Sequence, residues 1–203
     1  EVCVCEMSQA NVEQISRIIE IAGSDPAGWR KTTLEERHKI MYEAANRLGE
    51  MRGDLIGCMC AITGKTVVEG DVEVSEGLDY ARFYTTSMKL FADLPDVDIT
   101  PEGTVLVISP WNFPCAIPIG GIVAALAGGN TVILKPATVA APVAWLFAQA
   151  FWDAGVPKEA LQVIITDRDA LKVLTSAPAI KHIILTGGTD TAQNIARSNP
   201  STP

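Results

Sequence analysis

The sequence contains few basic residues and no long hydrophobic run. Its 16 lysines and arginines stand against 24 aspartates and glutamates, so the formal net charge is −8 at pH 7. A chain of this charge offers no basic surface to neutralise phosphates, which excludes a nucleic-acid-binding protein. No apolar stretch approaches the ~20 residues that a membrane-spanning helix needs, so we expect no membrane span. A small molecule is therefore the expected binding partner.

The sequence also lacks a basic N-terminal segment and the usual cysteine spacing of zinc sites. The first six residues include two glutamates and no lysine or arginine, unlike a signal peptide. Among five cysteines, Cys3 with Cys5 and Cys58 with Cys60 form C-x-C pairs, whereas most zinc sites use C-x-x-C. We expect small, reduced thiols in a cytoplasmic protein and no metal, with a metal site at these pairs as the alternative.

Apolar residues recur at helical spacing through the first 92 residues. They predict helices over residues 9–22, from Thr33 to Leu48, and over 67–91. Thr33 followed by Glu36 has the pattern of a capping box at the start of the second of these helices. The sequence therefore predicts an α-helical N-terminal region.

The pattern changes after residue 92. Residues 93–103 hold two prolines and three aspartates and end on a glycine, which predicts a turn-rich connector. From residue 104 onward, short apolar runs alternate with helical segments. The expected strands are 104–108, 131–134, 161–165 and 181–186, each followed by a helix. This order predicts an α/β fold with a parallel sheet over residues 104–203, behind a helical region over 1–92.

Asn112 follows the first strand, where parallel sheets bind ligands. It lies in a loop between Pro110 and Pro114, whose rings restrict the backbone of their neighbours. An amide held there is suited to donate a hydrogen bond to a developing oxyanion. The alternative is an asparagine that caps the next turn.

Lys135 and a pair of glycines stand at two other strand ends. Lys135 ends the second strand and suits ribose hydroxyls or phosphate, although a solvent-exposed lysine is the alternative. Gly187-Gly188 lies at a strand-to-helix junction, where backbone N–H groups are suited to hold a pyrophosphate. That signal is weak alone, and the G-x-G-x-x-G fingerprint of dinucleotide-binding proteins is absent.

Two other features have competing interpretations. Cys115 lies three residues from Asn112, but neither His38 nor His182 is near it in sequence, which favours a thiol packed behind the loop over a nucleophile. The segment 67–91 offers these apolar residues for packing: Val68, Val72, Leu78, Ala81, Phe83, Tyr84, Met88 and Phe91. Its acidic residues are expected to form a solvated face, and a catalytic carboxylate pair is the alternative. They are Glu69, Asp71, Glu73, Glu76 and Asp79.

Two motifs now identify a family. Trp-Asn-Phe-Pro at residues 111–114 and Lys-Pro at 135–136, at this spacing, are highly specific, and with them the chain resembles the aldehyde dehydrogenase superfamily. Trp29-Arg30 with Glu36-Arg37, and Ala154-Gly155-Val156-Pro157, match the same superfamily. The segment 71–84 is similar to the branch of 1-pyrroline-5-carboxylate dehydrogenases, which oxidise L-glutamate γ-semialdehyde to glutamate in proline catabolism.

The resemblance covers almost the whole chain, but about the first half of such an enzyme. We therefore expect an N-terminal fragment of a larger enzyme. The resemblance implies a homo-oligomeric parent, which in this branch is often fused behind a proline dehydrogenase domain.

The resemblance implies a Rossmann-like domain that binds NAD, or NADP, without the glycine fingerprint. It implies that Asn112 is the oxyanion-hole amide and that Lys135 contacts the adenosine ribose. Further cofactor contacts are implied for Ile108, Ser109, Pro110 and Trp111 on the nicotinamide side, for Pro136, Ala137 and Thr138 after the lysine, and for Gly187 and Gly188 under the pyrophosphate.

Three positions depart from the family pattern. Thr138 stands where a ribose-binding glutamate is usual, which leaves the preference between NAD and NADP open. Gly188 stands where a serine is usual, and residues 163–169 lack the glycine that normally follows this strand.

The resemblance implies that the family's nucleophilic cysteine and general-base glutamate lie in the half of the enzyme that follows residue 203. We therefore expect cofactor binding and one oxyanion donor, without dehydrogenase activity by this chain alone. Two alternatives stay open. One is a non-catalytic structural or interaction module that keeps the fold, and the other is a dehydrogenase for another aldehyde such as succinate semialdehyde.

Overall fold

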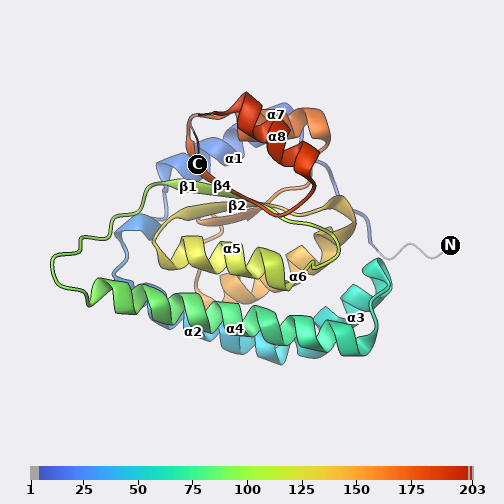
Figure 1. Cartoon of the computed structure of the whole chain (residues 1–203), viewed down its shortest axis with the longest axis horizontal. Coiled ribbons are helices and arrows are strands. Elements are labelled where there is room, and N and C mark those ends of the chain that lie inside the picture. Colours follow the sequence, from blue (N-terminus) through green and yellow to red (C-terminus); the bar gives the residue numbers. More distant parts are fainter. Residues whose placement is uncertain (1–4, 201, 203) are drawn as a thin grey trace.

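Four parallel strands form the sheet of the computed structural model, which describes residues 5–200 and 202 (Figure 1). They are β1 (Thr104–Ile108), β2 (Thr131–Lys135), β3 (Leu161–Val163) and β4 (Ile180–Leu185). Their spatial order is β3-β2-β1-β4, with Ile108 of β1 level with Lys135 of β2 and Leu185 of β4. The predicted α/β fold with a parallel sheet is confirmed.

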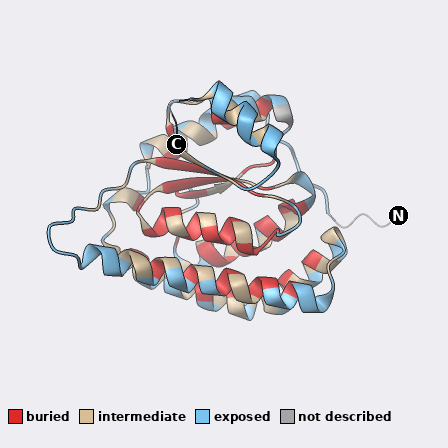
Figure 2. Cartoon of the chain, in the orientation of Figure 1, coloured by how far each residue is buried: buried red, intermediate tan, exposed pale blue. Residues whose placement is uncertain are grey.

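Helices cover both faces of this sheet (Figure 1). On one face lie α1 (Val12–Ser24), α7 (Arg168–Thr175) and α8 (Thr189–Ser198). On the other lie α5 (Ala116–Ala127) and α6 (Ala141–Ala154), with α2 (Leu34–Glu50), α3 (Arg52–Thr63) and α4 (Val67–Ala92) outside them. Two 3-10 turns, η1 (Trp29–Lys31) and η2 (Thr138–Ala140), complete the elements. Figure 2 shows burial concentrated in the sheet and in α5 and α6, whereas α8 buries no residue fully.

The side chains of β1 and β2 alternate between two cores. Val105 and Val107 pack into the core on the α5 side, and Leu106, Ile108 and Ile133 pack into the core on the α1 side. Successive residues of a strand point to opposite faces, so a sheet covered on both faces needs apolar residues at every position. This requirement accounts for the unbroken apolar runs in the sequence.

The helical N-terminal region is joined to the sheet by specific hydrogen bonds. Trp29 Nε1 donates to the Leu126 carbonyl at 3.3 Å, and Arg37 Nε donates to the Ala127 carbonyl at 3.1 Å. Both carbonyls lie at the C-terminus of α5, where helical carbonyls lack intrahelical partners. The described parts of the two regions, 1–92 and 104–203, therefore share one core, and their division into separate regions stays a prediction.

The helix α4 buries a face that its hydropathy does not predict. The expectation that Leu78 and Ala81 pack inward is confirmed, since both are buried. Val68, Val72 and Phe83 are 74%, 63% and 64% exposed, so the same expectation is wrong for these three. The buried residues are Gly70, Glu73, Val74, Gly77, Leu78, Ala81 and Thr85. A Cβ on Gly77 would lie 3.2 Å from Ile119 Cδ1, so glycine is what lets α4 approach α5 closely. The expected solvated face is also wrong at Glu73, which is 1% exposed.

The strand β3 is shorter than the predicted 161–165. The Ile164 N–H still donates to the Leu134 carbonyl at 2.8 Å, but the Ile165 carbonyl accepts from the N–H of Ala10 at 2.8 Å. The N-terminal segment thus forms a backbone hydrogen bond with the end of this run. Within the described residues, no helix combines the length and hydropathy that spanning a bilayer requires.

Candidate functional site

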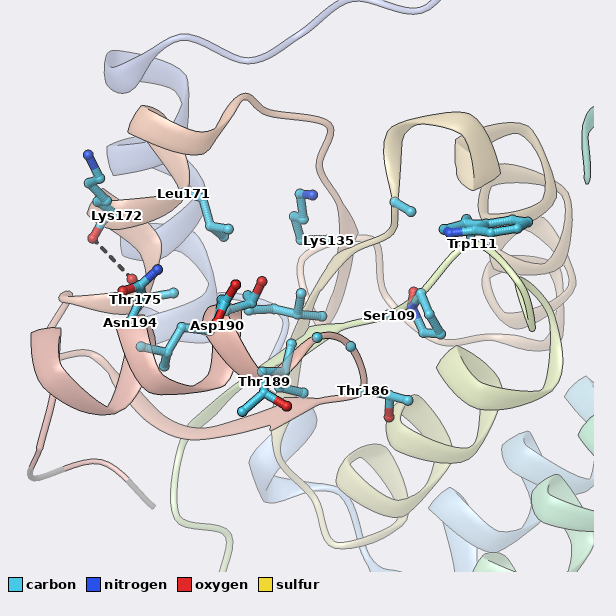
Figure 3. Close-up of a pocket in the computed structure, with 18 of the residues that line it drawn as sticks. Ser109, Trp111, Lys135, Leu171, Lys172, Thr175, Thr186, Thr189, Asp190 and Asn194 are labelled. Atoms are coloured by element: carbon cyan, nitrogen blue, oxygen red, sulfur yellow. Dashed lines mark hydrogen bonds between the residues drawn. The ribbon is translucent and has the colours of Figure 1, made fainter.

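A groove of about 1320 Å³ opens at the carboxyl ends of the strands (Figure 3). The chain runs from β1 through β2 to β3 on one side, and β4 lies on the other side of β1. The strand order therefore reverses between β1 and β4, and the loops that follow these two strands separate from each other. Open α/β sheets bind ligands at such a switch point. The groove is the candidate functional site.

Most of the predicted site residues line this groove. They are Ile108, Ser109, Pro110, Trp111, Asn112, Lys135, Ala137, Gly187 and Gly188. Pro136 is buried beside Lys135, and Thr138 is exposed at the start of η2; neither belongs to the groove lining. The fold thus brings together residues from the ends of three strands.

Lys135 places an ammonium group in the groove. Its side chain is half-buried, and within residues 5–200 and 202 its Nζ has no hydrogen-bond or ion-pair partner. Burial lowers the pKa of Lys135, because desolvation disfavours the charged form. Figure 3 shows its side chain standing between Leu171 of α7 and Trp111. A ligand with hydroxyl or phosphate oxygens would supply the partner that this ammonium lacks.

Ser109 ties the loop after β1 to the loop after β2. Its N–H donates to the Lys135 carbonyl at 3.3 Å, and its own carbonyl accepts from the N–H of Ala137 at 3.1 Å. The Ser109 side chain is 5% exposed, and its Oγ is buried without a hydrogen-bond partner in the described chain. Buried hydroxyls normally have partners, so this orphan is an available contact for a ligand.

The Asn112 amide is exposed at the mouth of the groove. The helix α5 that follows has Cys115 as its N-cap residue and no side-chain cap, so Asn112 does not cap it. Trp111 beside it is 57% exposed. A side-chain amide without a structural hydrogen bond is suited to donate to a ligand at the strand end.

The glycines form the opposite wall. Gly188 is the N-cap residue of α8 and has no atoms within 4 Å of an added Cβ, so a ligand has room to approach the backbone. Asp190, in the first turn of α8, also lines the groove and brings a negative charge that opposes an anionic ligand at this end.

Sequence reasoning missed the residues that α7 and α8 contribute. Leu171, Lys172, Thr175, Asn194, Ile195 and Ser198 line the groove. Most are polar, and in sequence they resemble the solvated side of an ordinary helix. In the structure, α8 differs from an ordinary surface helix because it has no fully buried residue. The sequence alone does not reveal this difference.

Cys115 is fully buried behind the Asn112 loop, as expected for a packed thiol. Burial raises the pKa of Cys115 well above its usual range, which disfavours the thiolate that a nucleophile needs. Burial also raises the pKa of Cys58. Cys3 lies outside the described residues, and the remainder holds no group of three His, Cys, Asp or Glu side chains placed to bind a metal.

Comparison with known proteins gives relatives along nearly the whole chain. It is 32% identical over 195 residues to the 1-pyrroline-5-carboxylate dehydrogenase of Geobacillus sp. (strain WCH70), covering 91% of this chain and 38% of that protein. It is 32% identical over 168 residues to the alpha-ketoglutaric semialdehyde dehydrogenase of Bacillus subtilis (strain 168), covering 78% of this chain and 34% of that protein. The chain thus spans little more than a third of the length of these relatives.

A solved structure has the same fold. Proline utilization A (PutA) from Corynebacterium freiburgense superposes with a TM-score of 0.92 at 34% sequence identity, over 100% of this chain and 21% of that one. The model of the aldehyde dehydrogenase family matches residues 1–202. On this match, together with the resemblance carried by the motifs at 111–114 and 135–136, the chain belongs to the aldehyde dehydrogenase family.

Proposed function

We propose that the chain is the cofactor-binding portion of an NAD(P)-dependent dehydrogenase that oxidises L-glutamate γ-semialdehyde to glutamate. The observation that carries the proposal is the groove at the strand-order reversal. Lys135, whose ammonium has no partner among the described residues, lines this groove together with Ser109 and Asn112.

The residues of the groove fit a nicotinamide dinucleotide. Lys135 would hold ribose hydroxyls, Ser109 and Trp111 would line the nicotinamide side, and Gly187-Gly188 would lie under the pyrophosphate. Asp190 and Thr138 do not distinguish NAD from NADP, so the binding experiment uses both cofactors. The cofactor, when bound, supplies the hydride acceptor.

Asn112 would act on the aldehyde. Its amide N–H groups would donate to the carbonyl oxygen as negative charge develops there. Removing one such donor typically costs about 10²–10³ in kcat. The loop between Pro110 and Pro114 limits backbone motion, which keeps the donor oriented before the reaction.

The nucleophile is proposed to lie outside this chain. Cys115 is the cysteine nearest to Asn112 in sequence, and its burial and raised pKa make it unsuited to attack an aldehyde. We therefore expect the 203-residue polypeptide to reduce no NAD with glutamate semialdehyde by itself. Measurable reduction by the purified chain would refute this.

The aldehyde is the least constrained part of the proposal. Relatives of equal identity are named for different substrates, 1-pyrroline-5-carboxylate and alpha-ketoglutaric semialdehyde, and the first name supports glutamate semialdehyde. Succinate semialdehyde is the competing substrate. Likeness to PutA, of which the chain covers 21%, supports a parent that is fused to a further domain. We propose that this parent is cytoplasmic and homo-oligomeric and that the further domain is a proline dehydrogenase.

Calorimetric titration of the chain with NAD and, separately, NADP tests the proposal. We expect saturable binding of at least one of them, with quenching of Trp111 fluorescence because its exposed ring lines the groove. A natively folded chain that binds neither at millimolar concentration would instead favour the non-catalytic structural module.

A further inference from the structure

Glu73 on α4 is a buried carboxylate that neither the fold nor the proposed function has yet explained. It is 1% exposed, although neighbouring acidic residues such as Asp71 and Asp79 lie at the surface. Its Oε1 accepts from the N–H of Cys115 at 2.7 Å and from the N–H of Ala116 at 3.2 Å. A carboxylate with two backbone donors is held firmly in place.

These two N–H groups are at the start of α5, immediately beyond the Asn112 loop. The first N–H groups of a helix have no intrahelical partner, and the positive end of the helix dipole favours an anion. Cys115 supplies no side-chain cap. Glu73 therefore caps α5 from another helix, 42 residues earlier in the chain.

Lys65 extends the contact to the other side of Pro114. Its Nζ lies 3.0 Å from Glu73 Oε2 and 4.3 Å from the centre of the Phe113 ring. The contact with Oε2 is an ion pair without hydrogen-bond geometry, since Oε2 has no hydrogen-bond partner within the described chain. Lys65 is 14% exposed, so solvent screens neither the ion pair nor the cation–π contact strongly.

The two charges hold the residues on both sides of Pro114. Glu73 binds the backbone of Cys115, and Lys65 covers the ring of Phe113, the residue directly after Asn112. Burying an ion pair to cap a helix costs desolvation free energy for both charges. A local serine or aspartate would satisfy the same N–H groups without that cost. What the long-range pair adds is a fixed position of the loop relative to α4.

We propose that the Glu73–Lys65 pair is a positioning unit that holds the loop 109–114, and thereby places the Asn112 amide at the mouth of the groove. Its importance for catalysis rests on the proposed role of Asn112. The placement itself does not, and it is measurable in this chain without cofactor.

The test is the NMR signal of the Asn112 side-chain amide in uniformly ¹⁵N-labelled protein, assigned with Asn112→Asp. In Glu73→Ala and in Lys65→Met, we expect this signal to shift and broaden, and amide exchange at Cys115 and Ala116 to rise about tenfold in Glu73→Ala. Glu73→Gln keeps an acceptor for both N–H groups and should restore their protection, while the Asn112 signal stays perturbed because Lys65 has lost its anion.

Glu76→Gln is the matched control. Glu76 lies on the same helix and accepts from the Tyr80 hydroxyl at 2.8 Å. In the described residues it has no hydrogen bond or ion pair with the start of α5, so its replacement should leave Asn112 unchanged. An unchanged Asn112 signal in Lys65→Met and Glu73→Gln would overturn the proposal, even if Glu73→Ala fails to fold. Failure of the wild-type chain to bind NAD or NADP would instead refute the proposed function and leave this result standing.

Discussion

Replacing Lys135 with methionine should weaken cofactor binding and stabilise the free protein. The Lys135 ammonium is half-buried, has no anionic partner in the part of the chain that the structure describes, and lines the groove. Methionine keeps the unbranched stem and removes the charge. The same substitution therefore removes a ligand contact and a desolvation cost.

The loss of affinity follows from the strength of a charge-assisted hydrogen bond. Such a bond contributes about 1.5–3 kcal/mol, so the Kd for NAD should rise roughly 10- to 150-fold. Calorimetry with both proteins at the same ionic strength measures it. Lys172→Met is the control, because Lys172 lines the groove but its side chain is 75% exposed and pairs with Asp169. An ionic contact made by an exposed ammonium contributes at most about 1 kcal/mol. Loss of the Lys172 ammonium should therefore raise the Kd for NAD by no more than about fivefold.

The difference in stability between the wild-type protein and Lys135→Met should depend on pH in a definite direction. Burial lowers the pKa of Lys135 in the folded state below the value of 10.5 for a free lysine. As the pH rises through the folded pKa, the folded protein releases its proton before the unfolded chain does. The unfolded state then binds more protons, so wild-type stability rises with pH.

Urea unfolding at a series of pH values between about 7 and 10 measures this effect. The wild-type protein should be the less stable of the two at neutral pH and should approach Lys135→Met as the pH increases. A Kd for NAD that changes less than twofold, in a variant that folds normally, would refute the ligand role. A stability difference that does not depend on pH would refute the desolvation argument.

Three further predictions concern the helical N-terminal region and its packing against the end of α5 and the loop before β2. Thr33→Ala should lower the free energy of unfolding by about 1 kcal/mol, because the Thr33 hydroxyl accepts from the Glu36 N–H at the start of α2; a change within error in urea titration would contradict the cap. Gly129→Ala should destabilise by more than about 1 kcal/mol, because φ is +82° and the new Cβ would lie 2.8 Å from Pro101 Cγ; an unchanged thermal midpoint would contradict this strain. Trp29→Phe should cost about 0.5–1.5 kcal/mol by removing the indole donor to the Leu126 carbonyl, which keeps the Gly129 N–H at 2.9 Å as its other donor; chemical denaturation that gives no loss would show that the indole hydrogen bond does not stabilise the fold.

The sheet was predictable from sequence because its strands leave little choice. After an initial threonine in each, residues 104–108 and 131–134 are apolar at every position, which is compatible with a strand buried on both faces. Asn112 and Lys135 were predictable because ligand sites in parallel sheets follow the strands' carboxyl ends. The alternative of Asn112 as a helix cap depended on the hydrogen bonds of α5, which the sequence does not contain.

The orientation of α4 was not predictable in the same way. Its large apolar residues suggest one inner face, but the packed face uses Gly70 and Gly77, whose missing side chains allow close contact with α3 and α5. A hydropathy pattern gives glycine little weight, so it correctly includes Leu78 and Ala81 in the packed face but wrongly adds Val68, Val72 and Phe83. The burial of Glu73 was not predictable either, because the backbone N–H groups that it binds lie 42 and 43 residues further along the chain.

The backbone bonds of Ser109 to Lys135 and Ala137 have a consequence for the order of events at the site. They join the two loops that carry Asn112 and Lys135 into one body, so displacement of either loop is transmitted to the other. Ligands that contact the two loops are then energetically coupled, and such coupling is reciprocal. If the proposed function holds, a cofactor that tightens the Lys135 loop should also order the Asn112 loop, and the aldehyde should bind more tightly as the second ligand than as the first.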